Sequence, residues 1–418
     1  MAPFFPHEAA KKGVSETVTG LVFSAYALMG FLMGPTFGKL IPAFGPKFTL
    51  LAGTFLTGVS CVIFGTLGMI ENTMVFVALC FVMRIMEGVG YAAYNTAVFS
   101  ITAHMFPNNV GVAMGLLELF VGIGLTVGPA LGAFLYEVGG YGLPFYALGG
   151  FMIMTIPINS MILRSDEEFL KDQLPESRAI GPLLCHGPSV LICGIITVIA
   201  MNITSLSPTL QPHVAEIGLK VSTAGLLFVL NLGCYTLMSP IAGWISDRFP
   251  FRRRTLIAFG IMMSGISFCF LGPVAFLPFL ENSLLTNVIG LLINGFGNSL
   301  SLVPTFQAIH DAALNVGYAE GIGTLSVVSG MWSGMASLGE VLGPAASSSL
   351  YAHYGMPVVG LAFFGLCMVA STLLATVDCV SNWRRQQPQI TPKDDEMLNL
   401  NVDPIPNQPS NESNDHGC

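Results

Sequence analysis

The sequence has few charged residues, and this scarcity excludes most soluble architectures. Only 10% of its 418 residues are Asp, Glu, Lys or Arg, whereas soluble domains carry about 25%. Hydrophobic residues make up 53% of the chain, and its mean hydropathy is +0.70. A soluble chain this apolar lacks the polar side chains that a water-facing surface needs, whereas a lipid-facing chain needs few. The composition therefore predicts an integral membrane protein.

The sequence also lacks the short motifs of enzymes and metal sites. None of the nine cysteines forms a CxxC pair, and HExxH, GxSxG and GxxxxGK[ST] are absent. Without the last motif, nothing indicates ATP-driven pumping. The net charge is −8 and no basic stripe is present. We therefore expect no enzymatic activity, no cofactor, no metal ion and no nucleic-acid partner. Residues 1–12 also lack the basic-then-apolar order of a signal peptide.

Eleven apolar runs are long enough to cross a bilayer, which takes roughly 17–25 residues. A polar stretch at 164–182 separates the fifth run from the sixth, and we expect it to be a cytoplasmic linker. From 381 to 418 the composition turns to Gln, Pro, Asn and Asp, which predicts a disordered cytoplasmic tail. The runs cover about 18–40, 48–69, 74–99, 112–136, 143–163, 183–206, 223–245, 255–279, 284–306, 321–347 and 356–378.

Lysine and arginine placement predicts the orientation in the membrane, because cytoplasmic loops carry an excess of these residues. Lys39, Lys47 and Arg248 fall on one side of the predicted spans, together with the linker and tail arginines. Lys11, Lys12 and Lys220 fall on the other side. The first side is therefore expected to be cytoplasmic and to hold the C-terminus.

The two halves of the chain repeat each other. Pro240 follows Pro35 by 205 residues, and the spacing G-x8-G-x3-G-P occurs twice, 215 residues apart. Parallel repeats of this kind are typical of major facilitator transporters. An offset of 205 sets Met1 opposite Leu206, at the end of the span that opens the second half. We therefore expect the first half to lack its first span, leaving eleven spans of twelve. The alternative is a protein with eleven helices.

The first of three motifs that resemble the major facilitator superfamily, over about residues 1–380, follows the second span of each half. GWISDRFPFRRR (243–254) resembles the family loop G-x-x-x-D-R-x-G-R-R. The resemblance implies that Asp247, beside Arg248, pairs with arginine and with a helix N-terminus to hold one face closed. The first-half copy, GKLIPAFGPK (38–47), has Pro42 where the aspartate belongs. For the arginines at 252–254 the alternative is simple topogenic charge.

The second motif, RIMEGVGYAA (84–93), resembles the family's arginine-containing span. Arg84 and Glu87 lie one turn apart in an apolar run, where a charge costs from about 2.5 kcal/mol upward, so both should be paired or face water. Two interpretations remain open. The residues form an internal ion pair, or they line a transport cavity together with Tyr91 and either Tyr94 or Asn95. In the second case Arg84 would modulate a carboxylate that carries protons.

The third motif, GLLELFVGIGLTVGPALGA (115–133), resembles the antiporter signature. The resemblance implies proton antiport of the drug/proton type, whereas a packing interface without a role in coupling is the alternative. Small residues let helices approach closely, and proline kinks a span. The signature residues are Gly124, Gly128 and Pro129, and their repeat partners are Gly339, Gly343 and Pro344.

Two further carboxylates lie within spans, at Glu118 and Glu340. Burial disfavours the charged form of a carboxyl group, so such a group can bind and release protons. We expect both to take part in proton coupling together with Arg84 and Glu87; a position near a helix end is the alternative. Four further polar residues are weaker candidates for substrate binding, or alternatively hydrogen-bond between helices: Tyr26, Asn231, Asn294 and Asn298.

Three stretches resemble the vesicular amine transporter family, most of all its polyamine branch: 2–13, 102–120 and 128–145. The resemblance implies an all-α major facilitator fold of two pseudo-symmetric helical bundles, at 1–163 (incomplete) and 183–380 (six helices). It also implies proton-coupled antiport of organic cations, such as polyamines or monoamines, into vesicles or out of the cytosol, by a monomer in a vesicle membrane or another intracellular membrane. Transport of an anionic or neutral solute is one alternative. A transport-inactive receptor or scaffold on the same fold is another.

Overall fold

The computed structural model describes residues 5–170, 180–272 and 283–386, and the regular structure in those ranges is entirely helical. Ten of the helices are long and apolar enough to cross a membrane. The last of them contains two spans, which meet at Gly355 with φ of 74°. With that helix counted as two spans, the described residues hold the eleven spans that the sequence predicts. The all-α membrane fold is therefore confirmed.

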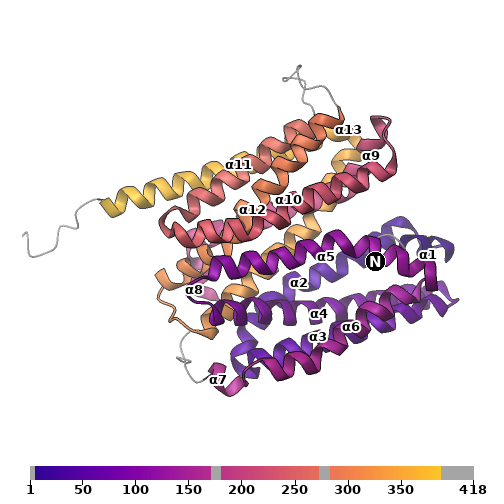
Figure 1. The fold of residues 1–418 in the computed structure, drawn as a ribbon, viewed down its shortest axis with the longest axis horizontal. Helices are drawn as coiled ribbons and strands as arrows, with labels where there is room; N and C mark the ends of the chain where they lie inside the picture. The colour runs from indigo at the N-terminus through magenta and orange to yellow at the C-terminus, as the bar shows by residue number, and fades with distance from the viewer. Residues whose placement is uncertain (1–4, 171–179, 273–282, 387–418) are drawn as a thin grey trace, which may run out of the picture. The chain divides into compact units, whose positions relative to one another are not determined.

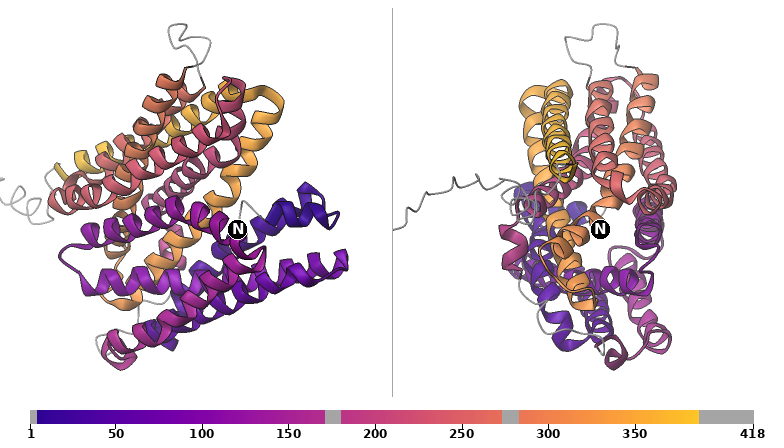
Figure 2. Two further views of the ribbon diagram at one scale, coloured as in Figure 1. Left: turned by 45° about the vertical axis from the view of Figure 1, so that its right-hand side comes forward. Right: turned by 90° about the vertical axis from the view of Figure 1, so that its left-hand side faces the viewer.

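The spans of each half gather into a bundle, shown in indigo to purple for the first and in magenta to yellow for the second (Figures 1 and 2). The first bundle contains α2 (Glu16–Phe44), α3 (Pro46–Thr66), α4 (Thr73–Met105), α5 (Val110–Gly139) and α6 (Gly142–Ile162). The second contains α9 (Gly187–Glu216), α10 (Val221–Arg248), α11 (Arg253–Leu271), α12 (Leu284–Asn315) and α13 (Ile322–Gln386).

Three short helices and two 3-10 turns complete the described chain. They are α1 (Phe5–Lys11), η1 (Leu67–Met69), α7 (Asp166–Leu170), α8 (Gly181–Cys185) and η2 (Pro250–Arg252). Helix α7 falls within the predicted linker at 164–182, whereas α8 begins at its end and extends to Cys185. Residues 171–179 of that linker, and 387–418 of the predicted tail, lie outside the described residues.

Local sequence signals set where several spans begin. Asn72 caps α4 by accepting hydrogen bonds from the N–H groups of Met74 and Val75, at 3.0 and 3.2 Å. Ser283 and Thr286 form a capping box at the start of α12. Gly45 separates α2 from α3 with φ of 94°, a conformation that favours glycine.

The start of α3 is tied to the end of α6 by two charged side chains. The Asp166 carboxylate accepts hydrogen bonds from the backbone N–H groups of Lys47 and Phe48, at 2.7 and 3.1 Å. In return, Nζ of Lys47 donates to the carbonyl oxygens of Ser160 and Leu163, at 2.5 and 3.0 Å. Each charge thus meets the helix end of opposite partial charge, within the first bundle.

The two bundles meet along two seams where small residues let backbones touch. Between α5 and α10, a Cβ atom on Gly111 would lie 2.5 Å from the carbonyl oxygen of Gly243. Between α2 and α13, a Cβ on Gly34 would lie 2.8 Å from the carbonyl oxygen of Gly330. Real Cβ atoms do not approach this closely, so larger side chains would force the bundles apart.

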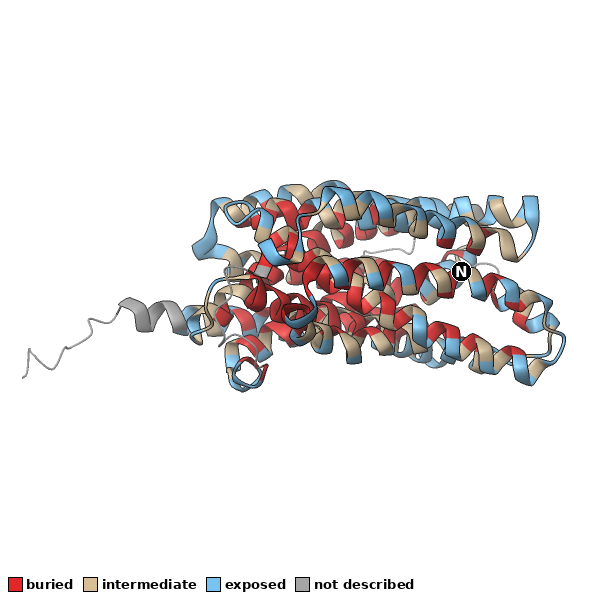
Figure 3. Ribbon diagram, turned by 90° about the horizontal axis from the view of Figure 1, so that it is seen from below, coloured by how far each residue is buried: buried red, intermediate tan, exposed pale blue. Residues whose placement is uncertain are grey.

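Both seams are closed at one end of the molecule, which we call the Asp247 end; there α2, α4, α10 and α12 finish and α5 and α13 begin. Toward the opposite end, near Gly140, a Cβ on Gly20, Gly124 or Gly225 would meet nothing within 4 Å. Buried positions are accordingly densest on the left of Figure 3, toward the Asp247 end. The bundles are therefore joined at the Asp247 end and part toward the Gly140 end.

Candidate functional site

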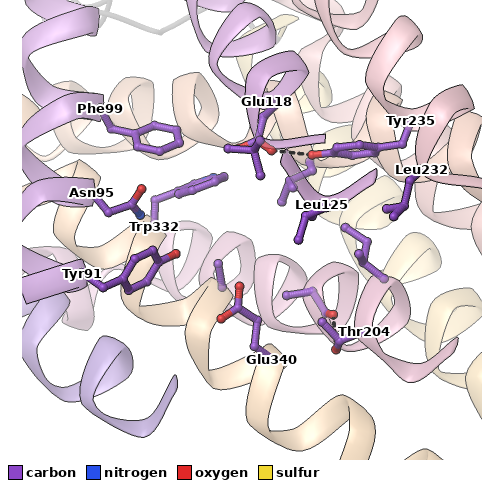
Figure 4. A pocket seen from close by; sticks show the side chains of 15 residues that line it. Tyr91, Asn95, Phe99, Glu118, Leu125, Thr204, Leu232, Tyr235, Trp332 and Glu340 are labelled. Atoms are coloured by element: carbon purple, nitrogen blue, oxygen red, sulfur yellow. Dashed lines mark hydrogen bonds between the residues drawn. The ribbon is translucent and has the colours of Figure 1, made fainter. Parts of the chain in front are cut away.

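A pocket of about 120 Å³ lies between the bundles. Its walls come from α4 and α5 of the first bundle and from α9, α10, α12 and α13 of the second. Most of its lining is aliphatic or aromatic. The side chains that add polar atoms are Tyr91, Asn95, Glu118, Thr204, Tyr235, Trp332 and Glu340 (Figure 4).

Two carboxylates face this pocket, one from each bundle. Glu118 on α5 is only 6% exposed and accepts a hydrogen bond of 2.6 Å from the hydroxyl of Tyr235 on α10. Glu340 lies well inside α13, on the opposite side of the pocket in Figure 4. The structure therefore brings together the two in-span glutamates that the sequence singled out, neither of them at a helix end.

Aromatic rings close the pocket on the side of the Asp247 end. The rings of Phe99 and Trp332 pack with centroids 4.6 Å apart, and the indole N–H of Trp332 donates to Thr305 at 2.9 Å. Beside them, the side-chain amide of Asn95 donates to the hydroxyl of Ser333 at 2.9 Å, joining α4 to α13. These contacts form a floor that links the two bundles.

Arg84 and Glu87 form an ion pair of 2.6 Å beside the pocket but do not line it. The Arg84 guanidinium also lies over the ring of Tyr26, at 4.5 Å from its centroid. Tyr26 in turn packs on Tyr91 with ring centroids 5.1 Å apart. Of the predicted candidates on α4, Tyr91 and Asn95 reach the pocket, whereas Tyr94 packs against Tyr91 outside it.

The predicted asparagines of the second half lie in a buried hydrogen-bond network. Asn294 accepts from the side chains of Asn231 and Asn298, at 3.2 and 2.9 Å. It donates to Asn202 at 3.0 Å and to Ser267 at 2.9 Å, so the network spans four helices. The geometry matches the alternative of interhelical hydrogen bonds. In the repeat alignment Asn294 corresponds to Glu87, so one half carries amides where the other carries charges.

Asp247 ties the start of α5 to the end of α10. Its carboxylate accepts from the backbone N–H groups of Gly111 and Val112, both at 2.8 Å, and from the side-chain amide of Gln307 at 2.6 Å. A helix N-terminus favours negative charge, so the contact stabilises the closed Asp247 end. Arg248 is exposed, and the nearby ion pair is formed instead by Arg253 with Asp311.

The antiporter signature has different surroundings in its two copies. A Cβ on Gly339 would lie 2.5 Å from the carbonyl oxygen of Thr197, and one on Gly343 would lie 2.6 Å from that of Met201. The copy that precedes Pro344 is therefore a packing surface for α9. A Cβ on Gly124 or Gly128, ahead of Pro129, would meet nothing within 4 Å.

Eleven of the fifteen lining residues were not anticipated from the sequence, among them Phe99, Thr204, Tyr235 and Trp332. Tyr235 and Trp332 carried a usable signal, because both lie in mid-span and carry a polar group that needs a partner when buried. Phe99 had no such signal, since phenylalanine is common on lipid-facing and pocket-facing surfaces alike.

Comparison with known proteins gives concordant matches. A family model described as Major Facilitator Superfamily matches residues 1–197 and again residues 190–400. The MFS-type transporter SLC18B1 of Homo sapiens is 36% identical over 356 residues, covering 85% of this chain and 77% of that protein. The chromaffin granule amine transporter of Rattus norvegicus is 26% identical over 332 residues, covering 74% and 60%.

The fold also matches a solved structure. The crystal structure of the human organic anion transporter MFSD10 (TETRAN) superposes with a TM-score of 0.64, at 19% identity and covering 88% of each chain. At that identity the match shows the fold alone.

Proposed function

The chain belongs to the major facilitator superfamily, and we propose that it exchanges protons for organic cations across an intracellular membrane. It is a multi-pass membrane transporter and not an enzyme, and vesicular amine transporters are among its relatives. The resemblance to that family seen in the sequence is thus confirmed. Coupling to protons and the cationic nature of the substrate are the proposal.

The observation that carries the proposal is the pair of carboxylates in the pocket. Glu118 and Glu340 bring two acidic groups into a wall that is mostly aliphatic and aromatic, and no lysine or arginine lines it among the residues that the structure describes. Carboxylates and aromatic faces both attract ammonium ions, whereas they disfavour anions. Tyr91 and Trp332 supply such aromatic faces.

The arrangement of the carboxylates favours substrates with more than one amino group. One acid comes from each bundle, and aliphatic side chains such as Leu125 and Ala336 lie on the same lining. A methylene chain with an ammonium group at each end fits this pattern, as in a polyamine. A monoamine would engage only one acid, so we expect it to bind more weakly.

Exchange follows from competition for the same group. A buried carboxyl group without a counter-ion favours its protonated form, whereas a bound ammonium ion favours the carboxylate. Proton and amine therefore displace one another at Glu118. The arginines at the Asp247 end indicate that this end is cytoplasmic. Because it is closed, the pocket faces the vesicle lumen in this arrangement. The amine would leave the pocket for the lumen, and a proton from the lumen would bind Glu118. We place the protein in a vesicle membrane with a cytoplasmic C-terminus.

The test is uptake of a labelled polyamine into proteoliposomes under a pH gradient. Glu118→Gln should abolish uptake driven by the gradient while leaving some binding, and Glu118→Asp should keep part of the activity. Glu216→Gln is the matched control, because Glu216 bonds to a tyrosine hydroxyl at 2.7 Å but lies outside the pocket. Normal uptake by Glu118→Gln would show that Glu118 is not the proton carrier. Uptake of anions but not amines by the wild type would refute the proposed function.

A further inference from the structure

We propose that Tyr235 is a positioning residue that ties the ionised Glu118 to the opposite bundle. The tie prevents the transporter, when neither proton nor amine is bound, from switching the pocket from one side of the membrane to the other. The inference rests on the proposed function, because it assigns Glu118 the exchange of a proton for a cation. It adds a reason why the exchange is obligatory.

The contact joins two buried groups from different bundles. Tyr235 on α10 is 5% exposed and Glu118 on α5 is 6% exposed. The tyrosine hydroxyl donates to Oε2 of the carboxylate at 2.6 Å, as the dashed line in Figure 4 shows. A hydrogen bond to an ionised acceptor is roughly twice as strong as one between neutral groups. The strength of this link between the bundles therefore depends on the charge of Glu118.

The hydrogen bond lies near the point where the two helices separate. Toward the Asp247 end the seam is closed by Gly111 against Gly243, and it stays closed as far as Gly122 against Thr236. Beyond that pair, a Cβ on Gly124 of α5 or Gly233 of α10 would meet nothing within 4 Å. A tie at this position bears directly on whether α5 and α10 stay together.

The charged and titratable groups around Glu118 leave Tyr235 as its hydrogen-bond donor. Tyr91 on α4 and the second acid, Glu340 on α13, line the same pocket as Glu118. Arg84 is engaged with Glu87 and Tyr26. Neither Tyr91 nor Glu340 has a hydrogen bond to Glu118 in the described structure.

The consequence is a rule for which states can switch. With Glu118 ionised and no cation bound, the Tyr235 hydroxyl meets a full negative charge and the tie is strongest. A proton neutralises that charge, and an ammonium ion competes for it, so either ligand weakens the tie. Only the loaded forms then separate α5 from α10 readily. An exchanger needs this behaviour, because an unloaded carrier that switches access lets protons leak.

The decisive experiment is proton leak through proteoliposomes that contain no amine, followed with a trapped pH dye after a pH jump. Tyr235→Phe removes the donor and keeps the ring, so we expect the leak to rise about 10- to 100-fold, the factor expected for losing one hydrogen bond to a charged group. Glu118→Asp withdraws the carboxylate by one methylene and should leak as well. In Tyr235→Phe with Glu118→Gln the leak should disappear, because no proton carrier remains.

The matched control is Tyr351→Phe, which removes a tyrosine-to-glutamate hydrogen bond of 2.7 Å outside the pocket and should leave the leak at the wild-type level. A Tyr235→Phe protein with wild-type proton leak and normal pH-driven amine uptake would overturn the inference while leaving the proposed exchange intact. If Tyr235→Phe does not fold, a wild-type proton leak in Glu118→Asp would overturn it in the same way. A leak that depends on Glu118, in a protein that transports no amine, would support the tie and refute the proposed substrate.

Discussion

Replacing Asp247 by asparagine should open the Asp247 end of the molecule. The carboxylate accepts three hydrogen bonds, two of them from N–H groups at the start of α5. Asparagine keeps one acceptor oxygen but turns a donor toward Gly111 or Val112 and removes the charge at the helix N-terminus. One lost charge-assisted bond is worth about 1.5–3 kcal/mol and the helix terminus about 0.3–1 kcal/mol. A total of about 2–4 kcal/mol shifts the equilibrium about 30- to 1,000-fold.

The assay is the distance between spin labels at the Asp247 end, one on each bundle. Met105→Cys on α4 and Phe251→Cys on η2 are exposed attachment sites, in a protein whose exposed Cys185 and Cys379 are replaced by serine. Asp247→Asn should populate a longer distance that is rare in the parent.

The matched control is Asp166→Asn, because Asp166 also caps a helix N-terminus but does so within one bundle. It should lower the melting temperature without lengthening the distance. Equal distances in Asp247→Asn and its parent would refute the assignment of Asp247 as the contact that holds this end closed.

Two further predictions concern packing. Asn294→Ala removes the hydrogen bonds that Asn294 makes to several buried amide and hydroxyl groups. It should destabilise the second bundle by about 1–3 kcal/mol, seen as a lower melting temperature in detergent. An unchanged melting temperature would contradict this role for the network. Gly34→Val places side-chain atoms against the backbone of Gly330 and should push the bundles apart in the same spin-label assay, whereas Gly20→Val, which meets open space, should not; equal effects would count against the seam between α2 and α13.

The sequence predicted the spans and the in-span acids because both depend on local composition. An apolar run of bilayer length leaves the backbone few choices besides a helix. A glutamate inside such a run, as at Glu118 or Glu340, must face protein or water. Both therefore had to point inward, and the structure places them in one pocket.

The choice between Tyr94 and Asn95 shows where the sequence stops being informative. These residues lie three and four positions after Tyr91, so either shares its helical face within the scatter of a 3.6-residue period. The structure places Asn95 in the pocket and packs Tyr94 against Tyr91 and the buried cluster that includes Leu50 of α3. Nearby, a Cβ on Gly53 of α3 would lie 2.6 Å from the backbone nitrogen of Tyr94. The decision depends on how closely α3 packs against α4, which a single helix does not encode.

The contact between Tyr235 and Glu118 was still harder to foresee, since it joins helices from different halves. The repeat relates α2 to α10 and α5 to the first span of α13, but it does not say which helices of the two bundles face each other. Small residues on α5 and α10 permit that seam. Only the packed structure shows that the tyrosine meets the glutamate there.

The repeat also indicates that the two access states of the proposed exchanger are not equivalent. With the offset of 215, Glu118 corresponds to Ser333 and Glu340 corresponds to Leu125, so neither acid has an acidic counterpart. Asp247 corresponds to Pro42, so the lock is present in one half only. When symmetric bundles change access, equivalent seams exchange roles while the acids and the lock stay with their own helices. The two access states therefore surround the same carboxylates differently and need not bind a proton or an amine with equal affinity. The gradients set the direction of net exchange, whereas this inequality sets how readily each ligand binds and leaves on each side of the membrane.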